Sequence, residues 1–367
     1  MNKLLSNVPG SKKRFRVLAI NPGSTSTKVA VYEEDDLLYE ASIQHSRKDI
    51  DACGPVVNQD GMRRAVVLKA LEEAGVPISS LDAVVGRGGL VDPIDSGTYL
   101  INDRMLADLV HSAASVHASS LGGIIASDIA KSAGIPSFVV DPVVVDELEP
   151  SAKLTGFPGI ERRSIFHALN QKAVARRVAR KMGIVYENGR FIVAHMGGGV
   201  TIGAHRYGRV IDVNDALSGE GPFTPERTGA IPALPLIRLC FSGAYTEQEL
   251  IDKVTKSGGM TAYLGTNDLR KCERLIKEGD EYAALVLESM AYQVSKEIGA
   301  MVAVLEGRVD AIILTGGLAY SNRFTGCIKQ RVGLIAPIEV FPGEEEMLAL
   351  AEGALRVLHG EEKALEY

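Results

Sequence analysis

The sequence contains no tryptophan, and aromatic residues make up only 5% of its 367 residues. A platform of aromatic side chains on which nucleic-acid bases could stack is therefore not expected. Cysteine is also scarce, and its four copies are scattered without a C-x-x-C pair: Cys53, Cys240, Cys272 and Cys327. This spacing is typical neither of a zinc site nor of a disulfide framework, so we expect reduced and mostly buried thiols.

Long apolar segments and long runs of one charge are missing as well. No stretch approaches the roughly 18 uninterrupted apolar residues of a transmembrane helix, and residues 1–15 have no apolar core long enough for a signal peptide. The formal net charge of −6 is spread along the chain, so neither nucleic acid nor a membrane is an expected partner. We therefore expect a cytoplasmic protein that binds small molecules. With 46% hydrophobic residues, its length suits about two to three domains.

The stretch from Arg16 to Tyr32 (RVLAINPGSTSTKVAVY) combines an apolar run, a small polar loop and a second, alternating run. This pattern predicts two strands joined by a turn that fits a phosphate. The loop offers an anion the Asn21 amide, the Lys28 ammonium and the hydroxyls of Ser24, Thr25, Ser26 and Thr27. A Walker A loop is not expected, because a strand rather than a helix follows the lysine. An ordinary Ser/Thr-rich hairpin turn is the alternative.

Three further candidates follow predicted elements. Arg87 stands among glycines after the buried run 82–86, where it could hold a carboxylate or phosphate. Asp141 closes the apolar run 137–140, and His167 stands near the start of a helix that we expect to run to about Met182. The alternatives are a solvated loop arginine, an Asp-Pro turn and a histidine that is merely packed.

A second stretch, RFIVAHMGGGVTIGAHRYGRVID from Arg190, matches residues 16–38 at a constant offset of 174. Gly23 falls on Gly197, Asn21 on His195 and Thr27 on Thr201. We interpret the match as an internal duplication, in which two phosphate-holding turns face one another across a cleft. A chance match of two glycine hairpins is the alternative.

The remaining chain supplies helices and one more glycine turn. A strand from Val309 runs into Gly316-Gly317, a place where a nucleotide can lie against bare backbone, although T-G-G alone is a weak signal. A long polar loop covers 212–229, and two helices are expected within 103–133 around the Gly122-Gly123 pair. Other helices are expected at 61–75, 232–241, 246–257, 267–278, 280–306 and 347–358.

Seven motifs occur in one order along the chain: N-P-G-S-T-S-T-K, V-G-R-G-G, V-V-D-P, R-R-x-x-F-H, H-M-G-G-G, L-T-G-G-L-A and E-E-M-L-A-L-A. In this order they resemble the acetate/propionate/butyrate kinase family from about residue 15 to 358, and the length fits the butyrate members best. The resemblance implies ATP-dependent phosphorylation of a short-chain carboxylate with Mg²⁺, which gives an acyl phosphate and ADP. The reaction would run in the ATP-forming direction during fermentation.

The same resemblance implies an α/β protein with a duplicated RNase H-like (actin-like ATPase) fold, whose two domains enclose an active-site cleft. We expect residues 1–188 to carry the first phosphate loop and the carboxylate site. Residues 189–345 would carry the second phosphate loop and the nucleotide site. Residues 346–367 would form a C-terminal helix that packs back toward the N-terminal domain. A homo-oligomer, a dimer or larger, is also implied.

Site residues are carried over position by position from the resemblance. The catalytic set is Arg87, Asp141, His167 and Arg227. The phosphate-binding set is Asn21, Ser24, Ser26, Lys28, His195, Gly197, Gly198 and Gly199. Gly316, Gly317 and Leu318 would bind the nucleotide, and Asn21 and Glu346 would help to hold the metal, with Glu345 as an alternative to Glu346. The substrate pocket would be lined by Gly89, Val116, His117, Phe166 and Pro225. Because a carboxylate is already ionised at neutral pH, Asp141 would position groups rather than abstract a proton.

The chain departs from the acetate enzymes at several motifs. Their H-L-G-N-G is His195-Met-Gly-Gly-Gly here, their F-H-G-T-S-H is Phe166-His167-Ala-Leu-Asn-Gln171, and the loop before Arg227 is shorter. Gly89 aligns with a pocket valine, so we expect a wider pocket for a four-carbon or branched acid.

Two alternatives stay open. Within the family, a propionate, isobutyrate or branched-chain acid kinase is the nearest. A nucleotide-binding protein without enzymatic activity, built on the same scaffold, is the remote one, because fold alone does not fix function. That reading leaves Arg87 and His167 unexplained.

Overall fold

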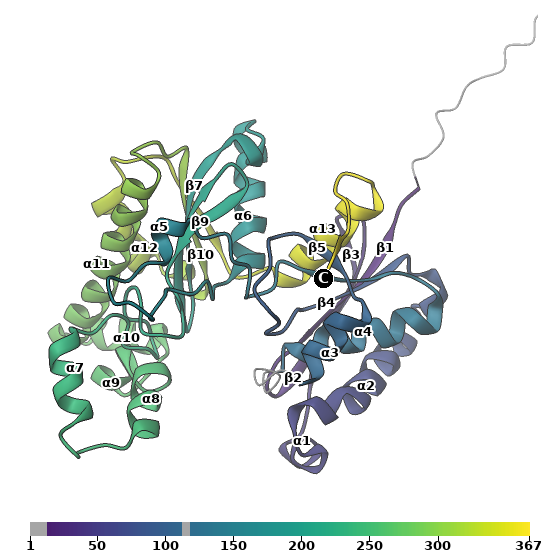
Figure 1. Cartoon of the computed structure of the whole chain (residues 1–367), viewed down its shortest axis with the longest axis horizontal. Helices are drawn as coiled ribbons and strands as arrows, with labels where there is room; N and C mark the ends of the chain where they lie inside the picture. The colour runs from purple at the N-terminus through teal and green to yellow at the C-terminus, as the bar shows by residue number, and fades with distance from the viewer. Residues whose placement is uncertain (1–12, 112–117) are drawn as a thin grey trace, which may run out of the picture. The chain divides into compact units, whose positions relative to one another are not determined.

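The computed structural model describes residues 13–111 and 118–367, in which the chain forms two compact units (Figure 1). Unit 1 comprises the chain up to Gly89 together with Gly97–Val140 and Leu350–Tyr367. Unit 2 comprises Leu90–Ser96 and Asp141–Ala349. None of the helices within the described ranges is both long and apolar enough to cross a membrane.

Unit 1 is built on a seven-stranded sheet in the order β12-β5-β6-β4-β1-β2-β3. Its strands are β1 (Arg16–Pro22), β2 (Ser26–Glu33), β3 (Asp36–Gln44), β4 (Ala83–Gly86), β5 (Thr98–Leu100), β6 (Ser137–Val140) and β12 (Leu365–Glu366). The interior strand β1 is antiparallel to β2 and parallel to β4. Its residues Val17 to Ile20 are fully buried, which explains the continuous apolar run, because a strand covered on both faces has no polar side.

Helices α2 (Asp60–Glu73), α3 (Asp103–His111) and α4 (Ser120–Ala133) lie beside one another on one side of this sheet (Figure 1). A shorter helix, α1 (Arg47–Cys53), precedes them.

The expectation that Gly122 and Gly123 separate two helices was wrong, since both lie in the first turn of α4. A Cβ atom on Gly86 would stand 2.1 Å from the Gly122 carbonyl oxygen. The glycines therefore let the helix and strand backbones touch.

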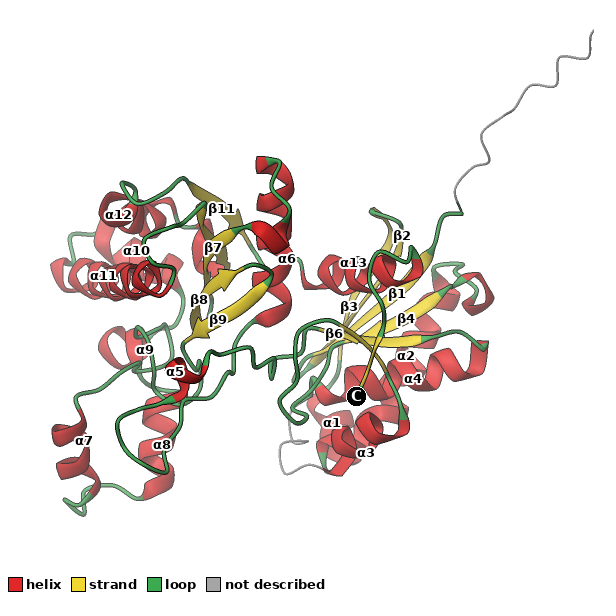
Figure 2. Cartoon of the chain, turned by 45° about the horizontal axis from the view of Figure 1, so that its top comes forward, coloured by secondary structure: helices red, strands yellow, loops and turns green. Residues whose placement is uncertain are grey.

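Unit 2 is built on a five-stranded sheet in the order β11-β10-β7-β8-β9. Its strands are β7 (Arg190–Met196), β8 (Val200–Arg206), β9 (Arg209–Val213), β10 (Ala311–Gly316) and β11 (Ile338–Pro342). Helix α6 (Ala168–Met182) covers one face, and α11 (Glu281–Val304) covers the other beside α10 (Leu269–Lys277) and α12 (Asn322–Val332), as Figure 2 shows. Since α6 packs on this sheet, the sequence-based boundary at 188/189 falls inside unit 2.

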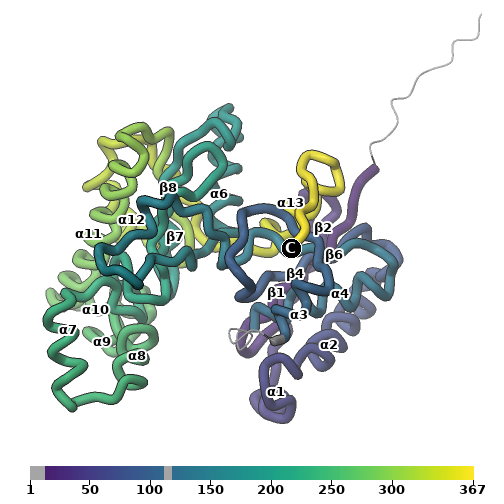
Figure 3. Tube along the Cα trace, in the orientation of Figure 1, coloured from purple at the N-terminus to yellow at the C-terminus, as the bar shows by residue number. Residues whose placement is uncertain are grey.

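Three short helices, α7 (Ala233–Cys240), α8 (Glu247–Thr255) and α9 (Gly259–Leu264), lie together at one end of unit 2 (Figure 3). Two others are α5 (Pro150–Lys153) and α13 (Glu346–Leu358). The helices predicted at 61–75, 232–241, 246–257, 267–278 and 280–306 are confirmed, with ends that differ by at most two residues. Sequence reasoning missed α12 and the short strands β5 and β12.

The two sheets confirm the internal duplication. The five strands β6-β4-β1-β2-β3 and β11-β10-β7-β8-β9 have the same order and the same parallel and antiparallel neighbours. The constant offset of 174 holds only for the first strand of each hairpin. Asn21 pairs with Lys28, whereas His195 pairs with Thr201, so the second turn is one residue tighter and Thr201 corresponds to Lys28 rather than to Thr27.

A buried ion pair fixes the segment Leu90–Ser96 within unit 2. Lys172 Nζ lies 3.0 Å from Glu147 Oε2, and both side chains are almost fully buried. Ser96 Oγ donates to Glu147 Oε1 at 2.7 Å and accepts from Lys172 at 2.6 Å. Burial alone would raise the pKa of Glu147, but the Lys172 charge with the Ser96 and Val210 donors holds that pKa below its ordinary value. The glutamate is therefore kept ionised inside the unit.

Replacing Lys172 with methionine should leave the Glu147 carboxylate buried without its cation. Breaking a buried ion pair from one side costs about 3–5 kcal/mol, so Lys172→Met should lower the urea midpoint of unfolding markedly. Lys181 is a matched control, because it lies on the same helix and pairs with Glu339 at 2.8 Å but is 60% exposed. Lys181→Met should cost at most about 1 kcal/mol. Equal midpoints for the two variants would contradict this account.

Candidate active site

The first predicted phosphate turn is the β1–β2 hairpin of unit 1. Gly23 N–H donates to Ser26 O at 2.8 Å and closes the turn. Asn21 and Lys28 face each other as a strand pair at its base, and Ser24 is exposed at its tip. The hairpin confirms that a strand, and not a helix, follows Lys28.

Sequence reasoning missed Arg63 of α2, which lies beneath this turn and is fully buried. Its guanidinium donates to Ser26 O at 2.9 Å, to Thr27 Oγ1 at 3.0 Å and to Ser24 O at 3.2 Å. Burial lowers the pKa of Arg63, and no carboxylate of residues 13–111 or 118–367 forms an ion pair with it. Arg63 thus fixes the turn and adds positive charge behind it. The signal was its helical spacing to the buried Val67.

The second predicted phosphate turn opens onto a cavity of about 850 Å³ in unit 2. Five of the predicted site residues line it: Gly197, Gly198, Pro225, Gly317 and Leu318. The cavity therefore joins the second phosphate turn to the predicted nucleotide turn. Sequence reasoning missed the other lining residues, namely Glu226, Asn267, Asp268, Leu269, Arg270, Glu273, Tyr320 and Ser321. They come from loops and helices without a motif of their own.

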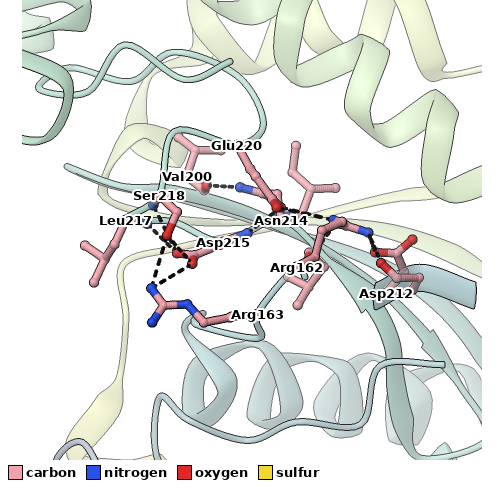
Figure 4. Close-up of polar contacts among 12 residues, drawn as sticks. Arg162, Arg163, Val200, Asp212, Asn214, Asp215, Leu217, Ser218 and Glu220 are labelled. Atoms are coloured by element: carbon pink, nitrogen blue, oxygen red, sulfur yellow. Dashed lines mark hydrogen bonds and ion pairs between the residues drawn. The ribbon is translucent and has the colours of Figure 1, made fainter. Parts of the chain in front are cut away.

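A network of polar contacts holds the loop that follows β9 (Figure 4). The Asn214 amide accepts from Ile202 N–H at 2.8 Å and donates to Val200 O at 2.9 Å, which ties the loop to β8. Arg162 spans Asp212 and Glu220, at 2.8 Å and 3.3 Å. Asp215 accepts from two loop amides and from the Ser218 hydroxyl. The loop is thus built on charged side chains rather than on regular structure.

The same loop positions Arg227 next to the second phosphate turn. Thr224 Oγ1 donates to Gly198 O at 2.6 Å and accepts from Arg227 N–H at 3.0 Å. A Cβ atom on Gly199 would stand 2.1 Å from Arg227 Nη1, so the guanidinium occupies the space that a side chain at this position would take. Arg227 Nη1 donates to Ala216 O at 2.9 Å, and its Nε is buried without a hydrogen-bond partner in the described part of the chain. An incoming anion is a suitable partner for that donor.

His167 and His195 stack on one another in unit 2, with ring centroids 3.8 Å apart and planes at 12°. His167 is the residue before α6, as the sequence predicts, and His195 lies on β7. His195 Nε2 lies 3.7 Å from Glu344 Oε1, and that carboxylate oxygen also approaches Gly197. The structure therefore brings the two predicted histidines and the second turn together.

Two other predicted residues of unit 2 are buried. Asp141 has a φ of 37°, a strained value for a residue with a side chain, and its Oδ2 lies 3.6 Å from Arg176 Nη1. An arginine on α6 therefore faces the aspartate. Phe166 is packed among Val145, Leu148 and Val213. It is therefore part of the hydrophobic core of unit 2, and its role in lining a substrate pocket stays a prediction.

The predicted carboxylate pocket lies only partly within the described residues. Arg87 follows β4 in unit 1, and its backbone touches α4, where a Cβ atom on Gly122 would stand 2.4 Å from Arg87 O. At Gly89, a Cβ atom would stand 2.6 Å from Ser120 Cα. Packing against α4 is therefore sufficient reason for a glycine at this position, and its role in widening a pocket stays a prediction. Val116 and His117 lie outside the described residues.

Of the metal ligands expected from the sequence, Asn21 lies in unit 1 and Glu346 in unit 2. Glu346 begins α13, Glu345 pairs with Arg177, and Glu344 is the glutamate whose carboxylate lies beside the second turn. The described residues contain no cluster of three or more His, Cys, Asp or Glu side chains arranged for a metal. Mg²⁺ needs only one or two carboxylates when phosphate oxygens and water complete its shell, so the residues near the turn fit such an ion.

The nucleotide turn contains a glycine that cannot be replaced. Gly316 has a φ of +85°, and a Cβ atom there would stand 2.4 Å from Met196 O. Gly316→Ala should therefore destabilise the protein by roughly 3 kcal/mol or more, because left-handed strain and backbone overlap add. Gly317→Ala is the matched control: no heavy atom lies within 4 Å of its ideal Cβ position, and the cost should stay below about 1 kcal/mol. Thermal unfolding of both variants tests the difference, and equal losses would refute it.

Comparison with known proteins agrees with this geometry. An acetate kinase from Porphyromonas gingivalis matches with a TM-score of 0.76 at 19% identity, over 93% of this chain and 99% of that chain. A propionate kinase from Francisella tularensis matches with a TM-score of 0.73 at 19% identity, over 92% and 98%. A ROK hexokinase from Thermus thermophilus matches with a TM-score of 0.51 at 15% identity, over 94% and 100%. The predicted actin-like ATPase fold, shared by carboxylate kinases and sugar kinases, is thus confirmed.

The sequence of unit 2 narrows this class further. Residues 154–327 match the model of the Acetokinase family. Members of this family are ATP-dependent kinases that phosphorylate a small carboxylate and use ATP or ADP with a divalent metal. The prediction of an ATP-dependent phosphotransferase with a carboxyl group as acceptor is therefore confirmed.

Proposed function

We propose that this chain is a butyrate kinase, which transfers the γ-phosphoryl group of ATP to butanoate and gives butanoyl phosphate and ADP. The observation that carries the proposal is the cavity of about 850 Å³ that joins the Gly197-Gly198 turn to Gly317 and Leu318. A nucleotide in this cavity places its phosphates at the second turn. The four-carbon acid is supported by the motif order and length of the chain.

The proposed chemistry needs aimed donors rather than a base. In the transition state, the transferring phosphoryl group spreads its negative charge over three oxygens, so cations and N–H groups that are already in place stabilise it. His167 and Arg227 of unit 2 are assigned to that group, Arg87 to the acid carboxylate and Asp141 to positioning. Asn21, Ser24, Ser26 and Lys28 of the first turn, and His195, Gly197, Gly198 and Gly199 of the second, are assigned to phosphate oxygens. Mg²⁺ would neutralise phosphate charge, and within unit 2 Glu346 or its neighbours would offer it a carboxylate.

A chain-length series tests the four-carbon acid. Each methylene buried in a fitting pocket contributes about 0.8 kcal/mol, or roughly fourfold in kcat/KM. ADP formation measured with acetate, propionate, butanoate, isobutyrate and valerate should therefore rise to a maximum at butanoate. A maximum at propionate or at a branched acid would replace butyrate kinase by the corresponding enzyme. Binding of ATP without turnover of any acid would favour the non-enzymatic alternative.

We also propose a homo-oligomer, supported by the apolar surface of α7 and its flanks. Helix α7 has no buried residue, and five apolar side chains there are between 37% and 88% exposed: Ile231, Leu234, Ile237, Leu239 and Phe241. An apolar patch of this kind marks an interface with another protein surface, and a second copy is the simplest partner.

Light scattering tests the oligomer. Leu234→Glu buries a charge in the proposed interface, so it should reduce the mass of the assembly, whereas Lys277→Glu at an exposed position of α10 should not. A wild-type protein with the mass of one chain at micromolar concentration would contradict the proposal.

A further inference from the structure

Two neighbouring amides at the start of α6 contact the stacked histidine pair. Asn170 and Gln171 are both almost fully buried. Asn170 Oδ1 lies 2.7 Å from His195 Nδ1, and Gln171 Nε2 lies 2.9 Å from Thr201 Oγ1, which in turn lies 3.0 Å from His167 Nδ1. Each amide therefore controls one imidazole, one directly and the other through a hydroxyl.

A backbone carbonyl fixes the orientation of each amide, because a carbonyl oxygen can only accept. Asn170 Nδ2 donates to Glu344 O at 2.7 Å, so its Oδ1 faces His195 and accepts a hydrogen bond from Nδ1–H. Gln171 Nε2 donates to Thr201 O at 3.1 Å as well as to the hydroxyl. Gln171 Oε1 then faces His205 Nε2 at 3.0 Å and must accept from it.

The Thr201 hydroxyl links Gln171 to His167 and decides which ring nitrogen of His167 carries the proton. Thr201 is fully buried, and its Oγ1 already accepts from Gln171. Among the described residues, the hydroxyl proton has one acceptor within hydrogen-bonding distance, His167 Nδ1. A buried hydroxyl proton without an acceptor is costly, so His167 Nδ1 accepts and its ring proton resides on Nε2.

The contacts of His205 with Tyr186 are consistent with this assignment of hydrogen-bond donors and acceptors. His205 Nδ1 lies 2.8 Å from the Tyr186 hydroxyl. Burial lowers the pKa of His205 well below its ordinary value, so this imidazole is neutral, and burial keeps Tyr186 protonated. Tyr186 therefore donates to His205 Nδ1, and His205 donates from Nε2 to Gln171. Every donor in the series meets an acceptor.

We propose that Asn170 and Gln171 are positioning residues that hold the stacked histidines with opposite proton placement, His195 protonated at Nδ1 and His167 protonated at Nε2. For His167 this presents an N–H donor at Nε2 toward a phosphoryl oxygen, and this consequence rests on the proposed function. The pattern uses residues that differ from the acetate enzymes, since Gln171 stands where their motif ends in histidine.

Nitrogen-15 chemical shifts of the imidazole rings test the proton placement without any need for activity. In the whole protein, His167 should show an unprotonated Nδ1 and a protonated Nε2, and His195 a protonated Nδ1; a His167→Gln variant assigns the first ring among the seven histidines. A protonated Nδ1 on His167 would overturn the proposal.

Gln171→Glu tests whether the amide sets this direction. A carboxylate can only accept, so it should accept a hydrogen bond from the Thr201 hydroxyl, whose oxygen then accepts from His167 and favours the ring proton on Nδ1. Loss of the Nε2 donor should lower kcat on the order of 10² with KM for ATP unchanged within about twofold. Thr201→Ser keeps the hydroxyl and should retain both the wild-type shifts and kcat, whereas Thr201→Val should lose them. An unchanged His167 ring in both Gln171→Glu and Thr201→Val would overturn the role of Gln171. Correct shifts in a protein that turns over no carboxylate would contradict the proposed function alone.

Discussion

Three consecutive buried polar side chains at the start of α6 hold unit 2 together. Asn170 contacts His195 of β7, Gln171 contacts Thr201 and His205 of β8, and Lys172 pairs with Glu147. Because buried polar groups are costly unless every donor and acceptor is matched, this arrangement admits one placement of the helix on the sheet. The second phosphate turn, the stacked histidines and the segment Leu90–Ser96 all depend on that placement.

Glycines allow close backbone contacts in both units, at positions next to predicted site residues. Gly199 leaves room for the Arg227 guanidinium, Gly316 lets the nucleotide turn lie against Met196, and Gly122 lets α4 reach the backbone of Arg87. Each of these contacts would overlap with a Cβ atom. The glycine-rich motifs are thus explained by packing inside each unit as much as by approach of a ligand, and Gly89 belongs to the same group.

The sequence predicts the fold well where its signals are local. Apolar runs such as Val17 to Ile20, and the repeated hairpin at Arg190, predict the strands and the duplication, because burial on both faces leaves a pattern in adjacent residues. Arg63 and the lining of the cavity from Asn267 to Glu273 were missed, since their importance arises from contacts distant in the chain. The one-residue difference between the two turns could not be read from a constant offset, because only strand pairing defines register.

The proposed function requires that this chain phosphorylate a carboxylate directly. Trapping with hydroxylamine in the presence of ATP, Mg²⁺ and butanoate measures that step, because an acyl phosphate reacts to give a coloured hydroxamate. The account predicts butanoyl hydroxamate formed in step with ADP, and loss of both when butanoate is left out. Release of ADP at the same rate with no hydroxamate, or no ADP at all with any acid from two to five carbons, would contradict it.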